Sequence, residues 1–180
     1  MELLQKVRIL NHMKRCCMYP CIHKTSVAEH SYHVALLSLF VGEELIAKGV
    51  NVNIEKVMSL ALIHDLDEAV TSDLPYPVKN HVKKAIKEYI DDKFDNELNH
   101  MTPAWLKTRF NGMNCKEFEY RIVKACDMAE LLMYCIDEME LGNRKVRDMA
   151  ETACRVLIDL NMEIQSNHLN NIVTKFDIIR

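Results

Sequence analysis

His64 and Asp65 directly follow an almost wholly apolar run, residues 57–63, that contains neither Gly nor Pro. Such a run is typical of a helix that is buried on most sides. Burying an imidazole and a carboxylate without partners costs roughly several kcal/mol, so the pair needs either a charge partner or a metal. Neutral imidazole and carboxylate are both common ligands of divalent cations. The pair therefore predicts a metal site at the end of a buried helix, and it indicates that this site is catalytic.

Further residues of the right types recur elsewhere in the chain. His30 falls in the first turn of an expected long helix, Asp127 interrupts an apolar run in a later helix, and Glu68 lies four residues after His64. If the helix continues that far, Glu68 shares a face with His64. Two imidazoles and two carboxylates from three helices suit Mn²⁺, Fe²⁺, Co²⁺, Ni²⁺ or Zn²⁺ and leave positions for water and substrate. On spacing alone, a polar network in the core without a metal is an equally good interpretation.

The helices that must position these residues are marked by capping patterns. Residues 26–29 form a capping box, which predicts a helix to about Lys48 that is ended by Gly49. Asn53 is suited to cap the next helix, which is expected to run to His64 and Asp65. These two helices would place His30 at the start of one and the His-Asp pair at the end of the other.

The second half of the chain also reads as helices. Residues 71–77 contain two prolines and predict a loop beside the site, followed by a polar helix over 82–90 and a short helix that begins at Pro103. A second capping box at 114–117 predicts a helix to about Met139, and Asn143 is suited to start another to about Gln165 before a short last helix. With no long alternating stretch, repeat or linker, the prediction is a compact all-α bundle, one domain over residues 1–180.

Composition bounds the class of protein. The chain has 180 residues, 49% of them hydrophobic and 27% charged, with a net charge of -3 and a pI near 6.2. No basic field argues for a polymeric nucleic acid partner. Neither a signal peptide nor a bilayer-spanning run is evident, so we expect a cytoplasmic protein with no membrane partner. The cysteine spacing matches no zinc finger or ribbon, and the odd count of 7 favours reduced thiols.

The order His30, His64-Asp65, Asp127 resembles the H…HD…D signature of the HD-domain metal-dependent phosphohydrolases. Within that superfamily, the string H-D-x-x-E-x-x-T-x-D-L-P-x-P-V-K over residues 64–79 is highly specific. Together with residues 29–31 and 124–127, it resembles the YfbR-like 5'-deoxynucleotidases and their small phage relatives, the dATP triphosphohydrolases. The resemblance extends from Arg15 to about Asn143.

The resemblance implies roles for individual residues. The implied ligands of a divalent cation (Co²⁺, Mn²⁺, Zn²⁺, Fe²⁺ or Mg²⁺) are His30, His64, Asp65 and Asp127. Glu68 would be the catalytic acid that positions or deprotonates the attacking water, and Asp73 a second acid near the leaving oxygen or the sugar. Arg15 and Lys79 would contact phosphate. These roles suit phosphoryl transfer, which mainly requires charge neutralisation and in-line positioning.

One position departs from the family pattern. Cys16 stands where the bacterial nucleotidases have a Trp that shapes the sugar and base pocket, so base preference does not transfer. Met18 and Tyr19 could contact a base, although core packing is the favoured interpretation for each. His33 lies one turn after His30 and matches no ligand, so packing or an outer contact with the site is expected.

The leading hypothesis is therefore a metal-dependent 5'-deoxynucleotidase that releases inorganic phosphate from deoxynucleoside monophosphates. A deoxynucleoside triphosphate triphosphohydrolase is the alternative, because both activities would share this site. A nucleotide-sensing module without turnover and a helical interaction scaffold are alternatives of other classes. The resemblance implies a deoxynucleotide as the small-molecule partner and a homo-oligomer, dimeric or larger.

Overall fold

The computed structural model describes residues 2–73, 108, 113 and 116–179. Lys79, the helix expected over residues 82–90 and the expected start of a short helix at Pro103 lie outside the described residues. The described elements, in chain order, are α1 (Glu2–Val7), the 3₁₀ helix η1 (Arg8–Asn11), α2 (Val27–Ala47), α3 (Ile54–Ile63), α4 (Glu68–Thr71), α7 (Phe118–Glu140), the 3₁₀ helix η2 (Arg144–Val146), α8 (Arg147–Ile164) and α9 (Asn167–Ile179). An isolated β-bridge joins Lys14 and Ser26. The prediction of an all-α protein is confirmed.

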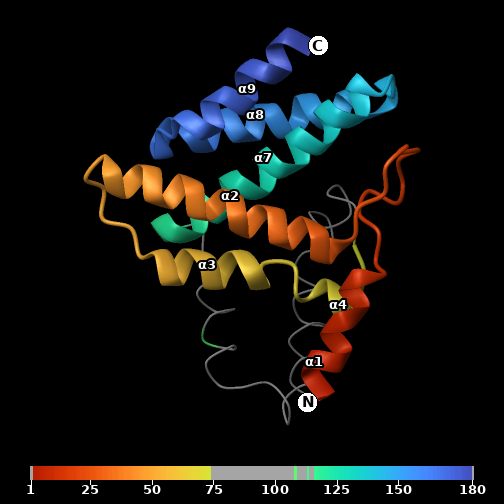
Figure 1. Ribbon diagram of the computed structural model, residues 1–180, viewed down its shortest axis with the longest axis horizontal. Coiled ribbons are helices and arrows are strands. Elements are labelled where there is room, and N and C mark those ends of the chain that lie inside the picture. Colours follow the sequence, from red (N-terminus) through yellow and green to blue (C-terminus); the bar gives the residue numbers. More distant parts are fainter. Residues whose placement is uncertain (1, 74–107, 109–112, 114–115, 180) are drawn as a thin grey trace.

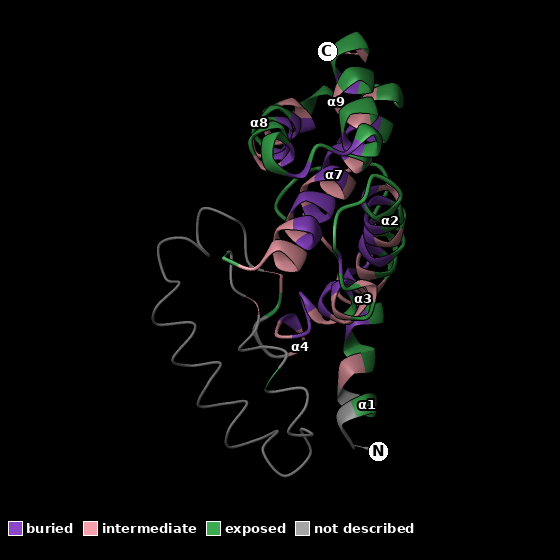
Figure 2. Cartoon of the chain, turned by 90° about the vertical axis from the view of Figure 1, so that its left-hand side faces the viewer, coloured by how far each residue is buried: buried purple, intermediate pink, exposed green. Residues whose placement is uncertain are grey.

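The helix α7 lies at the centre of the bundle. It crosses behind α2, with α3 below and with α8 and α9 above (Figure 1). Buried residues concentrate where α2, α7 and α8 face one another (Figure 2). On α7 the side chains of Ile122, Ala129, Leu132 and Ile136 are almost wholly excluded from solvent. The apolar side chains that drive folding are thus gathered along the helix that also contains Asp127.

The caps of the first long helices agree with the sequence. Ser26 Oγ accepts a hydrogen bond from the backbone N–H of Glu29, and the Glu29 carboxylate accepts one from the N–H of Ser26. Asn53 accepts a hydrogen bond from the N–H of Lys56 at the start of α3. Gly49 and Gly142, which follow α2 and α7, have φ angles of +84° and +90° that side chains disfavour. These predicted helix boundaries are confirmed.

Two expectations about helix boundaries were wrong. The helix α7 begins only at Phe118, with Glu117 at its N-cap position and no side-chain capping hydrogen bond there, and the Glu117 carboxylate pairs with Lys56 of α3. The helix α3 ends at Ile63, and a turn separates it from Glu68. This turn lets Leu66 join Leu10 and Val27 in a second apolar cluster, and the gain from that burial competes with continuing the helix.

The carboxylate of Glu44 ties α2 to the start of α9. It accepts hydrogen bonds from Ser166 Oγ at 2.6 Å and from the backbone N–H of Asn167 at 2.8 Å, and it pairs with Lys48 at 2.6 Å. Burial opposes its ionisation, but these contacts outweigh that effect and lower the pKa of Glu44 to about 2. A negative charge at a helix N-terminus is also favourable because of the helix dipole.

Replacing this carboxylate should weaken the fold in a pH-dependent way. Glu44→Gln is expected to lower the free energy of unfolding by about 1–3 kcal/mol at pH 7, because charged hydrogen bonds are lost. The pKa of Glu44 is lower in the folded state than its ordinary value of 4.5, so its contribution is complete above that value and is lost as pH falls toward 2. Urea unfolding at several pH values measures the difference.

Glu43→Gln is the matched control, since Glu43 is the exposed neighbour of Glu44 on α2. It should change stability by less than about 0.5 kcal/mol. A Glu44→Gln deficit of the same size at pH 6 and pH 2.5 would contradict the assignment.

Among the described residues, no helix is both long and apolar enough to span a bilayer.

Candidate metal centre

Donor atoms from distant parts of the chain converge at one point of the core. His30 comes from the first turn of α2, His64 and Asp65 follow α3, and Asp127 comes from α7. His30 Nε2 lies 3.2 Å from His64 Nε2, 3.6 Å from Asp65 Oδ2 and 3.2 Å from Asp127 Oδ1. His64 Nε2 lies 3.2 Å from the same Asp65 oxygen. The structure thus brings together the residues that the sequence predicted as ligands.

The spacing of these atoms fits a metal ion. Ligand bonds of about 2.0–2.1 Å in tetrahedral or octahedral geometry place neighbouring donor atoms about 2.8–3.4 Å apart. The ligating atoms of His30, His64 and Asp65 all lie within 4.8 Å of one another, and these residues are largely buried. Lone pairs on nitrogen and carboxylate oxygen repel one another at such distances unless a proton or a cation lies between them. The donor set is therefore suited to a divalent cation.

The other ring nitrogens determine which tautomer each imidazole adopts. His64 Nδ1 lies 2.7 Å from the carbonyl oxygen of Ala61, which is only an acceptor, so this nitrogen must be the donor. His30 Nδ1 donates to the carboxylate of Glu130. In both rings Nε2 then faces the other donor atoms as a potential ligand. Sequence reasoning missed Glu130; the available signal was its position three residues after Asp127, on the same face of α7.

The charges in the site are strongly coupled. Burial opposes ionisation of Asp65, but the nearby His64 imidazole and Arg15 guanidinium outweigh it and hold the pKa of Asp65 below its usual range. Burial likewise opposes ionisation of Asp127, but the Lys124 ammonium, 2.6 Å from Asp127 Oδ2, and the His30 imidazole hold the pKa of Asp127 well below its ordinary value. Both carboxylates are therefore anionic at neutral pH and available to a cation.

His30 shows the opposite shift. Burial and the charge of Arg15 disfavour its imidazolium, but hydrogen bonds to Asp127 and Glu130 outweigh them and raise the pKa of His30 to about 9. At neutral pH the metal-free ring therefore holds a proton among the acidic groups. A bound cation would displace that proton, because the negative charge of the surrounding carboxylates stabilises either a proton or a metal ion at this point.

Arg15 lies at the edge of this donor cluster. Its Nη1 donates to Asp65 Oδ2 at 2.8 Å, and its side chain is only 14% exposed. The segment that contains Arg15 is held in place by a backbone hydrogen bond from Arg15 to Thr25 and by Glu138, which accepts a hydrogen bond from the N–H of Ile22 at 2.7 Å. The predicted phosphate contact is thus a fixed cation beside the candidate metal position.

The two candidate catalytic acids flank the same region. Glu68 is fully buried and follows Asp65 by one turn, with its N–H donating to the Asp65 carbonyl. Asp73 Oδ2 accepts a hydrogen bond from the backbone N–H of Cys16 at 3.0 Å, which places its carboxylate beside the Arg15 segment. Lys79, the other predicted phosphate contact, lies outside the described residues.

Other predictions near the site had mixed outcomes. Met18 and Tyr19 are 70% and 38% exposed, so the expectation that they pack in the core was wrong; the segment after Cys16 turns along the surface. Cys16 itself is half-buried, with a φ of 53°. His33 is exposed on α2, and its Nδ1 lies 3.8 Å from Glu130 Oε1, so an outer contact with the site is the better description.

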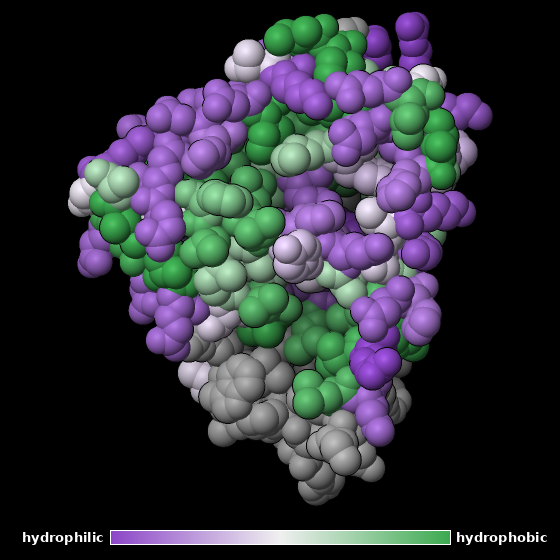
Figure 3. Space-filling view, in the orientation of Figure 1, coloured by the Kyte–Doolittle hydropathy of each residue, from purple (hydrophilic) through white to green (hydrophobic). Residues whose placement is uncertain are grey.

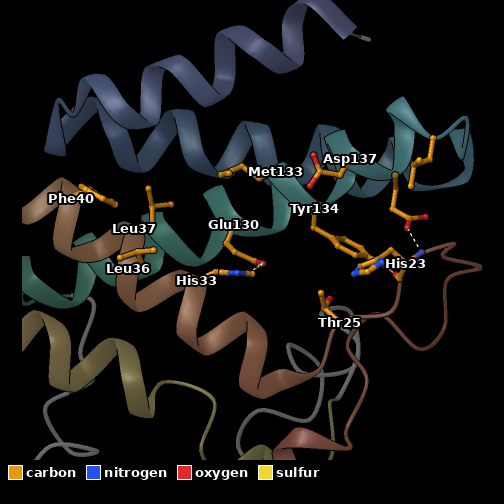
Figure 4. Close-up of a pocket in the computed structure, with 12 residues that line it drawn as sticks. His23, Thr25, His33, Leu36, Leu37, Phe40, Glu130, Met133, Tyr134 and Asp137 are labelled. Atoms are coloured by element: carbon orange, nitrogen blue, oxygen red, sulfur yellow. Dashed lines mark hydrogen bonds and ion pairs between the residues drawn. The ribbon is translucent and has the colours of Figure 1, made fainter.

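A cleft of about 580 Å³ lies between α2 and α7, on the face shown in Figure 3. Its lining is largely apolar, with Leu36, Phe40 and Met133, but it also includes His33 and Glu130 (Figure 4). None of the four candidate metal ligands is among the described residues that line it. Glu130 therefore separates this cleft from the donor cluster.

Comparison with known proteins places the chain in a family. The model of the family described as YfbR-like 5'-deoxynucleotidase matches residues 2–176. The chain belongs to the YfbR-like 5'-deoxynucleotidase family. A 5'-deoxynucleotidase of Vibrio vulnificus is 32% identical over a 149-residue alignment, and the match covers 76% of this chain and 75% of that protein. One from Photorhabdus temperata is 31% identical over a 148-residue alignment, and the match covers 78% of this chain and 73% of that protein.

Solved structures share the fold of this YfbR-like protein at lower identity. A Pyrococcus horikoshii protein superposes with a TM-score of 0.81 at 21% identity and covers 97% of this chain and 98% of its own. An HD phosphohydrolase of cyanophage S-2L, solved with dA and one catalytic Zn²⁺ ion, gives a TM-score of 0.63 at 20% identity and covers 98% of this chain and 95% of its own. The predicted family and the HD-type helical fold are confirmed.

Removing one acidic donor should weaken metal binding. At a Co²⁺ concentration of about 100 times the wild-type Kd, bound metal should stabilise the wild type by about 2.7 kcal/mol, whereas a variant with tenfold weaker affinity should gain only about 1.4 kcal/mol. We expect Asp127→Asn to behave as such a variant or worse, because an amide oxygen is a weaker ligand than a carboxylate. Thermal unfolding with and without Co²⁺ measures the gain, and only the difference is compared.

Asp137→Asn is the control for this experiment, because Asp137 lies on the same helix but is exposed. It should retain the wild-type gain. Equal stabilisation of Asp127→Asn and wild type would exclude Asp127 as a ligand.

Proposed function

We propose that this protein is a divalent-metal-dependent 5'-deoxynucleotidase that hydrolyses deoxynucleoside monophosphates to deoxynucleosides and inorganic phosphate. The observation that supports this most strongly is the convergence of His30, His64, Asp65 and Asp127 beside the buried cation Arg15. Membership of the YfbR-like family supports the choice of substrate. The roles of individual residues below belong to the same proposal.

The proposed ligands of the cation are His30, His64, Asp65 and Asp127. A divalent cation bound there would lower the pKa of a water molecule and polarise the phosphoryl oxygens. The protein supplies two imidazoles and two carboxylates, and the orientation of both rings is set in advance by their Nδ1 partners. Such preorganisation reduces the rearrangement that binding requires.

Arg15 is proposed to bind the phosphate. A guanidinium presents several N–H groups in one plane, which match the oxygens of a phosphate. One of these groups donates to Asp65, which fixes the plane of the side chain next to the donor cluster. Burial disfavours the charge of Arg15, but Asp65 and the other nearby carboxylates outweigh it and hold its pKa above the usual value. Arg15 therefore remains a cation that can neutralise phosphate charge. Lys79 is proposed as a second phosphate contact.

Glu68 is proposed to accept a proton from the attacking water, and Asp73 is proposed to contact the leaving group. Hydrolysis forms a bond from the water oxygen to phosphorus and breaks the bond from phosphorus to the 5'-oxygen. Glu68 would accept the proton of the attacking water, as suits a buried carboxylate one turn from Asp65. Asp73 would contact the leaving oxygen or the sugar from its position beside Cys16. The 5'-oxygen leaves with a proton as the deoxynucleoside hydroxyl.

Product analysis tests the proposed function. Purified protein with Mn²⁺ or Co²⁺ is incubated with a panel of deoxy- and ribonucleoside mono- and triphosphates. Inorganic phosphate from the deoxynucleoside monophosphates is the expected result. Intact triphosphate released from a deoxynucleoside triphosphate would establish the triphosphohydrolase instead, and bound metal with no product would establish a sensing module.

In the same assay Glu68→Gln should bind metal normally but lose about 100- to 10,000-fold in turnover.

Arg15 should act mainly through substrate binding. Arg15→Ala is expected to raise KM for the monophosphate by about tenfold or more, because charge-assisted hydrogen bonds contribute about 1.5–3 kcal/mol. Steady-state kinetics with saturating metal measures the change. Arg8→Ala removes an exposed arginine of η1 and should leave KM unchanged. A normal KM for Arg15→Ala would remove Arg15 from the phosphate site.

A further inference from the structure

Glu130 is a largely buried carboxylate for which the proposed reaction has no role. Its side chain is only 12% exposed, and it lies on α7 one turn after Asp127. Oε2 accepts a hydrogen bond from His30 Nδ1, while Oε1 faces His33 at the edge of the cleft. Figure 4 shows this side chain pointing from α7 toward α2, with His33 at the cleft. The carboxylate therefore lies between a candidate metal ligand and the surface.

The contact determines how His30 meets the donor cluster. A carboxylate accepts a hydrogen bond, so Glu130 keeps a proton on Nδ1 and leaves Nε2 as the nitrogen that faces His64 and Asp65, where a cation would displace its proton. Because His30 is fully buried, this N–H depends on a protein partner rather than bulk water. The hydrogen bond also prevents the ring from flipping, which would exchange the positions of the two nitrogens.

The two imidazoles differ in the charge of their partners. His64 donates from Nδ1 to a neutral backbone carbonyl, that of Ala61, whereas His30 donates to an ionisable side chain. A carboxylate partner makes a charge-assisted hydrogen bond, which is stronger than a neutral one. It also increases the electron density at Nε2 and thereby the basicity of the ligand. A single replacement at Glu130 can therefore change the donor strength of His30 without touching a ligand.

We propose that Glu130 is a positioning residue of the metal centre, which holds the His30 ring with Nε2 toward the cation and sets the affinity of the site. This proposal rests on the proposed metal site. Glu130 contacts the ligand and not the metal, so its loss weakens binding while all four proposed ligands remain. Carboxylates that contact metal-bound histidines in this way contribute about 10- to 100-fold in metal affinity.

Metal titration of a graded series of variants tests the proposal. The Kd for Co²⁺ is measured by competition with a chelator in wild type, Glu130→Gln, Glu130→Ala and Asp137→Asn, and the visible absorption of bound Co²⁺ reports its coordination. We expect Glu130→Gln to weaken binding about 10-fold, since its amide oxygen still accepts a hydrogen bond, and Glu130→Ala about 100-fold. Asp137→Asn removes a carboxylate from the same helix and cleft and should leave Kd unchanged.

A measurement on the wild type keeps the proposal testable if a variant does not fold. In the Zn²⁺-loaded protein with ¹⁵N-labelled histidine, the His30 resonances should show a proton on Nδ1 and ligation through Nε2. Ligation through Nδ1 would overturn the proposal.

The controls separate this proposal from the proposed function. Folded Glu130→Gln and Glu130→Ala proteins whose Kd lies within twofold of wild type would overturn the role of Glu130 alone. A wild-type protein that binds neither Co²⁺ nor Zn²⁺ would overturn the metal site together with it. Weaker binding by both Glu130 variants, with Asp137→Asn normal, is the supporting result.

Discussion

The mutual repulsion of buried donor atoms is the constraint on which this structure depends. His30, His64, Asp65 and Asp127 direct nitrogen and oxygen atoms at one point in the core, where water is largely excluded. In isolation each of these groups would be unfavourable there. The arrangement persists because positive groups surround it: Arg15 on Asp65, Lys124 on Asp127, and a proton on His30. The same excess of negative charge and lone pairs at this point would stabilise a divalent cation there.

The packing of α2 against α7 keeps those donor atoms at ligand spacing. Asp127 and Glu130 lie on the face of α7 that meets the start of α2, and the buried apolar residues of α7 continue from there through the core. Since protein interiors are closely packed, the separation of the two helices cannot change without disturbing many contacts. The segment that contains Arg15 is attached to the same framework through Glu138 of α7. Because loops lose much conformational entropy when ordered, such anchoring before substrate arrives favours binding.

The sequence by itself determined the helical class, the caps of α2 and α3, and the residue types that converge at the site. Capping and apolar periodicity are local properties, so Ser26, Asn53 and Gly142 marked helix ends correctly. The His-Asp motif and its surrounding string are specific enough to indicate the family. Local patterns failed where tertiary contacts compete with them: Glu117 pairs with Lys56 instead of capping its own helix, and Leu66 turns the chain into a second apolar cluster.

Only the tertiary structure decided how the polar residues are paired. His30 and Glu130 are one hundred positions apart in the chain, yet their side chains share a hydrogen bond. No local pattern relates such residues, because their contact depends on the crossing of α2 and α7. The same holds for Arg15 with Asp65 and for Cys16 with Asp73. The sequence therefore specified which chemical groups are present, whereas helix packing specified their distances, tautomers and charges, since these depend on neighbours brought together by folding.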